Sequence, residues 1–139
     1  MRLYLDTNVV LSAILFPNGR SAEFFRHAVT YHTVVLGSYV IDELRDVFQR
    51  KFPTRCDALE TFLDELSYEK VTTPQNIDKN DFPEIRDPKD LPVIACATES
   101  KCDYHITGDK DLHDIKEKTG ISILSPGAFL MIDDVYEDP

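Results

Sequence analysis

The sequence predicts an α/β domain in which helices cover a parallel, doubly wound β-sheet. Short apolar runs of strand length alternate with longer segments whose apolar residues recur at helical spacing. Acidic residues lie at or near the ends of several of these elements, and parallel sheets place their sites where strands end. The 139 residues, 42% of them hydrophobic, suit a single domain with one core, so we expect one domain over residues 1–139.

The predicted strands are short apolar runs, each close to a residue that favours a turn or a helix start. The first run is followed by Asp6, and the second is followed by Gly37. Apolar runs of this length bounded by such residues are typical of buried strands. The five predicted strands are residues 3–5, 33–36, 68–72, 104–107 and 121–124.

The predicted helices begin at polar capping residues and end at residues that favour turns. Ser21 and Ser38 are expected to cap the second and third helices. Residues 17–19 and Pro53 are expected to end the first and third, and residues 74–90, which are rich in proline and acids, form a predicted loop. The six predicted helices are residues 8–16, 21–31, 39–52, 55–67, 91–101 and 111–119.

The charge balance bears on which partners the chain can bind. The chain carries 25 acidic and 15 basic residues, for a net charge of −10. A protein that binds nucleic acid mainly through the phosphate backbone is usually basic, so the composition argues against a pure nucleic-acid-binding module. It argues less against a nuclease, because bound divalent cations would reverse the field of the acids that hold them. Residues 133–139 are expected to form a solvated acidic tail.

The cysteine content and the apolar runs indicate a cytoplasmic protein. The three cysteines include no CxxC pair, so we expect neither a disulfide framework nor a zinc site and infer a reducing compartment. No charged segment with a long apolar region precedes the first strand, so no signal peptide is expected. No apolar run approaches the roughly 20 residues needed to span a membrane.

Four acidic segments are predicted to converge at one edge of the sheet. They read LDTN at 5–8, IDEL at 41–44, RDPKD at 86–90 and TGDKDL at 107–112. Carboxylates that meet without basic partners repel each other unless they are protonated or bind a hard cation such as Mg²⁺ or Mn²⁺. A metal-dependent site that cleaves phosphodiesters is therefore the leading hypothesis.

Each of these acids also has a structural alternative. Asp6 and Asp90 both precede a predicted helix, so each could be an N-cap. Glu43 flanks the apolar stripe of its helix, so its carboxylate needs a partner. The structural alternative to a metal ion is an ion pair with an arginine. Asp111 is the better cap for the helix that follows it, which leaves Asp109 with no evident structural duty.

Other chemistries find less support in the sequence. Motifs for dinucleotide, P-loop, nucleophile-elbow and HExxH zinc sites are all missing. Cys96 lies in an alanine-rich helical segment and is expected to be a core residue rather than a nucleophile. The histidines lack paired-ligand spacing, and most of them are expected at the surface or core edge; they are His27, His32, His105 and His113.

A short basic run follows the second acidic segment. Such a run is usually a solvated face, but it is also the best candidate for contacting the phosphates of a nucleic acid beside the acidic pocket. Its residues are Arg45, Arg50, Lys51 and Arg55.

The motifs LDTNV, SYVIDEL, RDPKDLPVIACA and ITGDKDL together resemble those of PIN-domain ribonucleases, most closely the VapC-like toxins of prokaryotic toxin–antitoxin systems. The resemblance covers almost the whole chain, with the motifs in the family's order. It implies a Rossmann-like, three-layer α/β/α sandwich with a central parallel sheet. It further implies Mg²⁺- or Mn²⁺-dependent endoribonuclease activity, a homodimer, and inhibition by a separate antitoxin protein.

The resemblance also assigns site residues. Asp6, Glu43, Asp90 and Asp109 match the family's four acids, and Asp111 is the close neighbour of the fourth. These four acids are the expected catalytic residues, and Asp6, Asp90, Asp109 and Asp111 the expected metal ligands. The supporting polar positions are matched by Thr7, Asn8 and Thr107. Leu91 departs from the pattern, because toxins of this branch often carry a second acid or Asn there.

The expected reaction is hydrolysis of an RNA phosphodiester by water activated on a divalent cation. A phosphatase or DNA nuclease could use the same acids, although DTN in place of DxD argues against an aspartyl-phosphate phosphatase. The alternative outside hydrolysis is an inactive or RNA-processing PIN-like module that engages a protein partner. RNA turnover with and without metal separates these readings.

Overall fold

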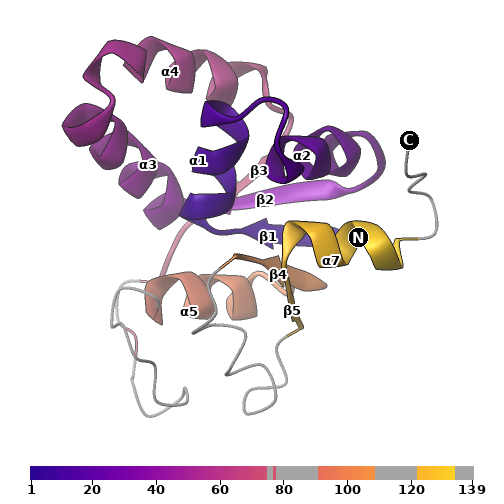
Figure 1. The fold of residues 1–139 in the computed structure, drawn as a ribbon. Coiled ribbons are helices and arrows are strands. Elements are labelled where there is room, and N and C mark those ends of the chain that lie inside the picture. Colours follow the sequence, from indigo (N-terminus) through magenta and orange to yellow (C-terminus); the bar gives the residue numbers. More distant parts are fainter. Residues whose placement is uncertain (75–76, 78–90, 109–121, 134–139) are drawn as a thin grey trace.

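The structure is a computed structural model that describes residues 1–74, 77, 91–108 and 122–133. Five parallel strands form one sheet: β1 (Arg2–Leu5), β2 (Thr33–Gly37), β3 (Glu69–Val71), β4 (Tyr104–Ile106) and β5 (Ile123–Leu124) (Figure 1). The predicted helix at 111–119 and most of the predicted loop at 74–90 lie outside the described residues.

The order of the strands creates a switch point beside the first strand. The sheet runs β3-β2-β1-β4-β5, so the chain builds outward from β1 on one side and then returns to build on the other. The register pairs Tyr4 with Val35 of β2 and with His105 of β4. In open parallel sheets, ligands bind at the carboxyl ends of the strands that flank such a switch point. Here these strands are β1 and β4, which end at Leu5 and Ile106.

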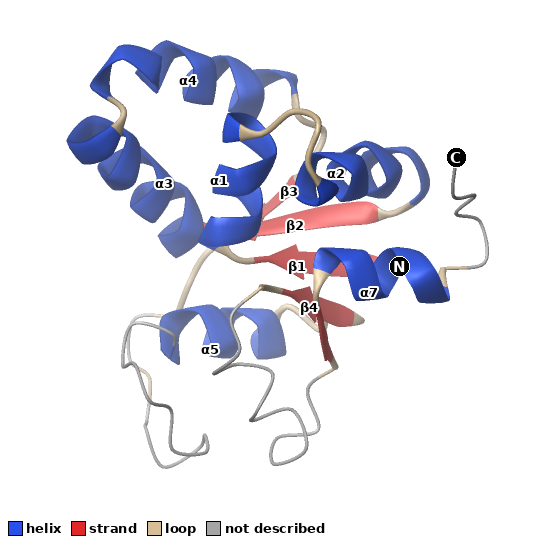
Figure 2. Cartoon of the chain, in the orientation of Figure 1, coloured by secondary structure: helices blue, strands red, loops and turns tan. Residues whose placement is uncertain are grey.

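Helices cover the sheet from both sides, which confirms the predicted α/β fold. In Figure 2, α1 and α2 lie on one side of the sheet and α5 on the other. Because both faces are covered, β1 is buried along Leu3, Tyr4 and Leu5 rather than alternating between core and solvent. The helices are α1 (Thr7–Leu15), α2 (Arg20–Tyr31), α3 (Ser38–Lys51), the short 3₁₀ helix η1 (Pro53–Arg55), α4 (Cys56–Glu65), α5 (Leu91–Glu99) and α7 (Pro126–Ile132). None of the helices in the described residues is long and apolar enough to cross a membrane.

Two of the predicted caps are wrong. The N-cap of α2 is Gly19 rather than Ser21, and the N-cap of α3 is Gly37 rather than Ser38. The Ser38 hydroxyl instead accepts a hydrogen bond from the Thr73 backbone N–H at 2.9 Å, and the Thr73 hydroxyl accepts one from the Tyr39 N–H at 3.0 Å. These two hydrogen bonds connect the start of α3 to the segment after β3. The Ser38 side chain therefore contacts a distant segment instead of capping its own helix.

Helix α7 was not predicted, although its capping signals are present. Ser125 accepts a hydrogen bond from the Ala128 N–H at 3.1 Å, and Pro126 occupies the first helical position. At seven residues the helix is too short to show a full apolar period. Phe129 and Leu130 are nonetheless buried, and Phe129 packs edge-on against Phe24 of α2.

Gly37 ends β2 at a point where no side chain fits. A Cβ placed there would overlap the buried hydroxyl of Tyr4 and lie 3.0 Å from the Cys96 Sγ. The glycine therefore allows β1, β2 and α5 to pack in contact at the carboxyl edge of the sheet, next to the end of β1.

We expect Gly37→Ala to lower the free energy of unfolding by about 1–3 kcal/mol, the range for overpacking in a core. Urea unfolding measures this difference. Gly127→Ala is the matched control, because the nearest atoms to its added Cβ belong to the flexible Arg20 side chain, at 3.4 Å. That variant should be neutral or more stable, and an equally small effect of both substitutions would contradict the close approach at Gly37.

Candidate active site

Asp6 lies where β1 ends and α1 begins, at the carboxyl edge of the sheet. Its side-chain Oδ1 accepts a hydrogen bond from the Val9 N–H at 3.0 Å, so Asp6 is the N-cap of α1. The positive end of the helix dipole therefore faces this carboxylate. Asp6 is only 7% exposed. The structural alternative for Asp6 thus holds, and it leaves the metal-binding prediction open because each carboxylate oxygen has more than one lone pair and can accept a hydrogen bond and bind a cation at the same time.

Thr107 brings a second predicted motif to the same place. The residue follows β4 and is fully buried, and its backbone N–H donates to the Leu124 carbonyl at 2.9 Å. Its hydroxyl donates a hydrogen bond to Asp6 Oδ2. The two residues are 101 positions apart in the sequence, and the Asp6 N–H also donates to the Ile106 carbonyl at 3.2 Å. The structure therefore joins the LDTN and ITGDKDL segments at the β1–β4 switch point.

The polar residues after Asp6 point in different directions. The Thr7 hydroxyl is buried and has no hydrogen-bond partner within the described residues. Asn8 is exposed and lines a pocket of about 90 Å³, together with Gly108. That volume is enough for about three water molecules, so the pocket itself could hold only part of a nucleotide. Its lining residues are Asn8, Val9, Ser12, Ser21, Gly108 and Pro126.

Glu43 lies in the first half of α3, the helix that starts at the carboxyl end of β2. It is half-buried, whereas its neighbour Asp42 is exposed on the solvent face of the helix. Glu43 forms no ion pair with any residue that the structure describes, so the arginine alternative finds no support there. Whether Glu43 takes part in catalysis stays a prediction.

Three of the predicted acids, Asp90, Asp109 and Asp111, lie outside the described residues. Leu91, which follows Asp90 in the sequence, is the first residue of α5. Two described residues directly precede Asp109. Thr107 bonds Asp6, and Gly108 lines the pocket.

The basic run has two ion-paired members. Arg45 forms a two-point pair with Glu60 of α4, at 2.8 and 3.2 Å, which lowers the pKa of Glu60. Arg50 pairs with Asp46 one turn earlier, at 2.9 Å. Lys51 and Arg55 are exposed and form no ion pair within the described part of the chain. The last two are therefore the members of the run most open to an external phosphate.

The Cys102 thiol and the buried Tyr4 phenol are poor nucleophiles here. Cys56, Cys96 and Cys102 are all free, as expected. Burial raises the pKa of the Cys102 thiol to about 11, and burial also raises the pKa of the Tyr4 hydroxyl well above its usual value. Both groups stay protonated at neutral pH, which disfavours covalent catalysis through them.

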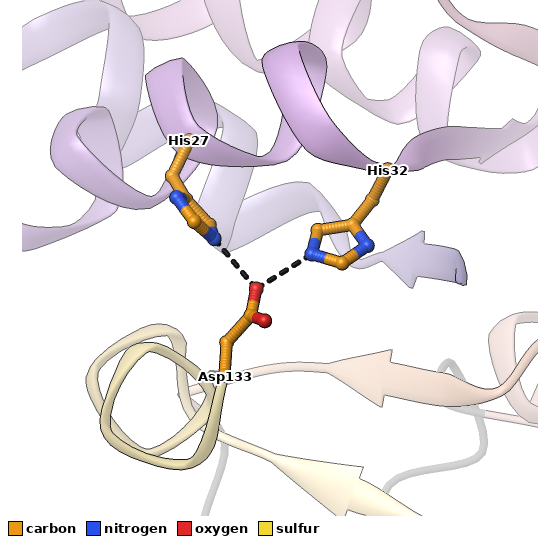
Figure 3. Close-up of side chains that lie close together, drawn as sticks. All are labelled: His27, His32 and Asp133. Atoms are coloured by element: carbon orange, nitrogen blue, oxygen red, sulfur yellow. Dashed lines mark hydrogen bonds and ion pairs between the residues drawn. The ribbon is translucent and has the colours of Figure 1, made fainter. Parts of the chain in front are cut away.

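One cluster of metal-binding residue types was not predicted from the sequence. His27 and His32, expected at the surface or core edge, meet the carboxylate of Asp133, the first residue of the expected solvated tail (Figure 3). The Asp133 side chain is only 6% exposed, so the prediction of a solvated position is wrong for this residue. The spacing of five residues between the histidines matches no helical ligand pair, and Asp133 is remote in sequence, so no local pattern indicated the cluster.

One comparison with known proteins shows a family, and another shows similarity of fold. The sequence profile described as the PIN domain matches residues 2–111. A chain of VapBC2 from Rickettsia felis, solved bound to a promoter DNA fragment, superposes with a TM-score of 0.69 at 15% identity; the match covers 90% of this chain and 98% of that one. VapBC-1 from nontypeable Haemophilus influenzae gives 0.62 at 14% identity, covering 91% and 99%. The PIN domain endonuclease Utp24 gives 0.56 at 21% identity, covering 89% and 84%. No curated protein matches the sequence significantly.

The double role of Asp6 in capping and in binding Thr107 predicts a ranked effect on stability. We expect Asp6→Ala to lower the free energy of unfolding by about 1–2 kcal/mol, because it removes the cap and leaves Thr107 without its acceptor. Asp6→Asn should cost less, because the amide oxygen still accepts from Val9 and the Thr107 hydroxyl can turn to accept from the amide. Chemical denaturation of both variants tests the ranking, and equal losses would contradict it.

Proposed function

The chain belongs to the PIN domain family, and we propose that it is a Mg²⁺- or Mn²⁺-dependent endoribonuclease that acts as the toxin of a toxin–antitoxin pair. The observation that carries the proposal is the Asp6 carboxylate, which is buried at the switch point and held by α1 on one oxygen and by Thr107 on the other. A carboxylate fixed in this way is oriented before any substrate arrives, as a metal-dependent site requires.

The donor set at this edge fits a hard cation. The described side chains at the site, Asp6, Thr7, Asn8 and Thr107, offer oxygen ligands, which Mg²⁺ and Mn²⁺ prefer. Among the described residues the buried Thr7 hydroxyl has no hydrogen-bond partner, and an additional ligand or bound water would remove the free-energy cost of burying it. We propose Asp6, Asp90, Asp109 and Asp111 as the residues that hold the metal.

A cation bound there would lower the pKa of a coordinated water and neutralise charge on the scissile phosphate. The chain itself supplies orientation and proton acceptance. Thr107 and the α1 N-terminus fix the Asp6 carboxylate, and Glu43, half-buried and without an ion pair in the described residues, would accept a proton from the attacking water. The pocket lined by Asn8 and Gly108 would hold part of the nucleotide next to the cleaved bond.

We further propose an antitoxin protein as the physiological partner, because two of the structural neighbours are VapBC complexes. An arginine of such a partner would bind the site carboxylates with two parallel hydrogen bonds and replace the metal. A peptide carrying that arginine should therefore compete with Mg²⁺.

One alternative is an inactive or RNA-processing PIN-like module whose role is to bind a protein. The net charge of −10 and the ion pairs that occupy Arg45 and Arg50 favour this alternative, because they reduce the attraction for RNA. Measured turnover of RNA in the presence of metal decides between the two.

The first functional prediction concerns the metal-binding acids. We expect Asp6→Asn and Asp90→Asn each to lower the rate of RNA cleavage at least about 100-fold, or about 2.7 kcal/mol of transition-state stabilisation, since each removes a charge that holds the cation. The measurement is cleavage of total RNA with mapping of the new ends, at several Mg²⁺ and Mn²⁺ concentrations.

The matched control is Asp42→Asn, which removes an exposed carboxylate of α3 next to Glu43 without touching the site. It should cleave like the unaltered chain. Retained activity in folded Asp6→Asn would mean that this residue only caps α1, and no cleavage by the unaltered chain with either metal would favour the binding module.

The second functional prediction concerns the basic run. We expect Arg50→Glu combined with Lys51→Glu to weaken RNA binding and to make its dependence on salt shallower, because fewer counterions are released. The charge-matched control is Arg26→Glu combined with Lys70→Glu, which changes exposed cations on α2 and β3. Equal affinities and slopes for the two pairs would show that residues 45–55 are an ordinary solvated face.

A further inference from the structure

A second group of potential metal ligands lies at the opposite edge of the sheet from Asp6. The Nε2 atoms of His27 and His32 each lie 2.6 Å from Oδ2 of Asp133, and the ligand atoms of the three residues are all within 4.8 Å of one another (Figure 3). His27 is on α2, His32 follows that helix, and Asp133 follows α7. The three side chains are 6–7% exposed.

The end of α2 is what brings the two imidazoles together. In a continuous helix, residues five apart would point about 140° away from each other. The helix instead stops at Tyr31, and His32 is its C-cap with an extended backbone, at φ −136° and ψ 177°. That conformation turns the His32 ring back toward His27, so the two ring centroids lie 5.6 Å apart.

The surrounding contacts hold the rings in place. Phe129 of α7 packs edge-on against the His32 ring at 5.4 Å between centroids. Asp133 is the C-cap of α7, and its backbone N–H donates to the Phe129 carbonyl at 3.1 Å. The other His32 ring nitrogen, Nδ1, lies 3.2 Å from the Met1 nitrogen. The group is thus fixed by side chains at the ends of α2 and α7 and by a contact with the Met1 nitrogen, rather than by a single loop.

We propose that His27, His32 and Asp133 form a binding site for Zn²⁺ or a similar borderline transition-metal ion. Two imidazole nitrogens and one carboxylate oxygen are a donor set that zinc accepts readily, whereas Mg²⁺ strongly prefers oxygen. The ion would take the place of the Nε2 hydrogens, which pass to the Nδ1 atoms of the rings or are released to solvent, so that each imidazole ligand is neutral. It would lie between the three ligand atoms. Three protein ligands leave the fourth position of a tetrahedral ion to water.

Binding an ion requires the three ligand atoms to rearrange. With bonds of about 2.1 Å, the ligand atoms of a tetrahedral ion lie about 3.4 Å apart. The carboxylate oxygen would therefore move outward by less than about 1 Å from its position 2.6 Å from each nitrogen. The two imidazole nitrogens, which lie within 4.8 Å of each other, would also have to reach a separation of about 3.4 Å, so the rings adjust together with the carboxylate.

This site is separate from the proposed catalytic centre in both place and chemistry. His32 directly precedes β2 and so lies at the amino edge of the sheet, whereas Asp6 follows β1 at the carboxyl edge. Helix α7 connects the two regions: Pro126 at its start lines the pocket beside Asn8, and Asp133 at its end belongs to the zinc site. An ion bound by α2 and Asp133 would hold α7 against α2 and stabilise the folded chain by mass action.

Titration calorimetry of the full chain with Zn²⁺, in excess Mg²⁺ to fill the hard-cation site, tests the proposal. We expect a Zn²⁺-binding event whose affinity falls more than about 100-fold in His32→Gln and in Asp133→Asn, because loss of even an outer partner of a metal ligand costs about 10- to 100-fold. Asp64→Asn, which removes an exposed carboxylate of α4, and Asp6→Asn should both leave this event unchanged. Unchanged Zn²⁺ affinity in folded His32→Gln and Asp133→Asn would overturn the site and leave only a hydrogen-bonded tie between α2 and α7.

X-ray absorption at the zinc edge tests the same site in the unaltered chain and does not depend on the variants folding. We expect two imidazole ligands with oxygen completing the shell. A sulfur-containing shell would instead place the ion on the cysteines, and a shell of oxygen alone would place it on the acidic surface. Either result would overturn the proposal without bearing on RNA cleavage, because the proposed catalytic residues are different ones.

Discussion

The arrangement of the candidate active site depends on one buried contact, the hydrogen bond from Thr107 to the Asp6 carboxylate. Strand order alone places the ends of β1 and β4 side by side, but side chains at those ends could still point apart. The contact fixes Asp6 Oδ2 toward β4, while the α1 N-terminus holds Oδ1. Both oxygens are thereby oriented at the switch point, and the pocket beside Asn8 and Gly108 opens next to them.

The strands of this fold could be predicted from the sequence because their signals are local. All five strands were predicted within about two residues of their positions, since both buried runs and turn residues are visible in the sequence. The errors fall where a residue serves a distant partner. Ser38 bonds Thr73 instead of capping its helix, and α7 is recognisable through packing onto α2 rather than through a period of its own. The convergence of the segments that contain Asp6 and Thr107 could be predicted from the expected parallel sheet. The hydrogen bond between the two side chains could not be predicted from the sequence.

The proposed RNA substrate is a polyanion, whereas the chain itself has a strong excess of acidic residues. Four of its 15 basic residues form ion pairs with carboxylates in the structure, namely Arg2, Arg20, Arg45 and Arg50. These pairs are solvent-exposed, so each contributes little to stability and can exchange its partner for a phosphate at low cost. Attraction for RNA would then depend on ions bound at the acids and on a few exposed cations, which makes the local field more important than the net charge.

The two ends of the sheet use carboxylates in different ways, and their partners determine the difference. Asp6 accepts hydrogen bonds from a backbone N–H and from a threonine hydroxyl, and the side chains beside it offer the oxygen ligands that a hard cation prefers. Asp133 is buried against two imidazoles, which can hold it as hydrogen-bond donors or share a softer ion with it. The residue type is the same, so the sequence alone does not separate these roles. Helix α7 begins at Pro126, which lines the pocket, and ends at its C-cap Asp133, so one short helix joins the two regions in which these carboxylates lie.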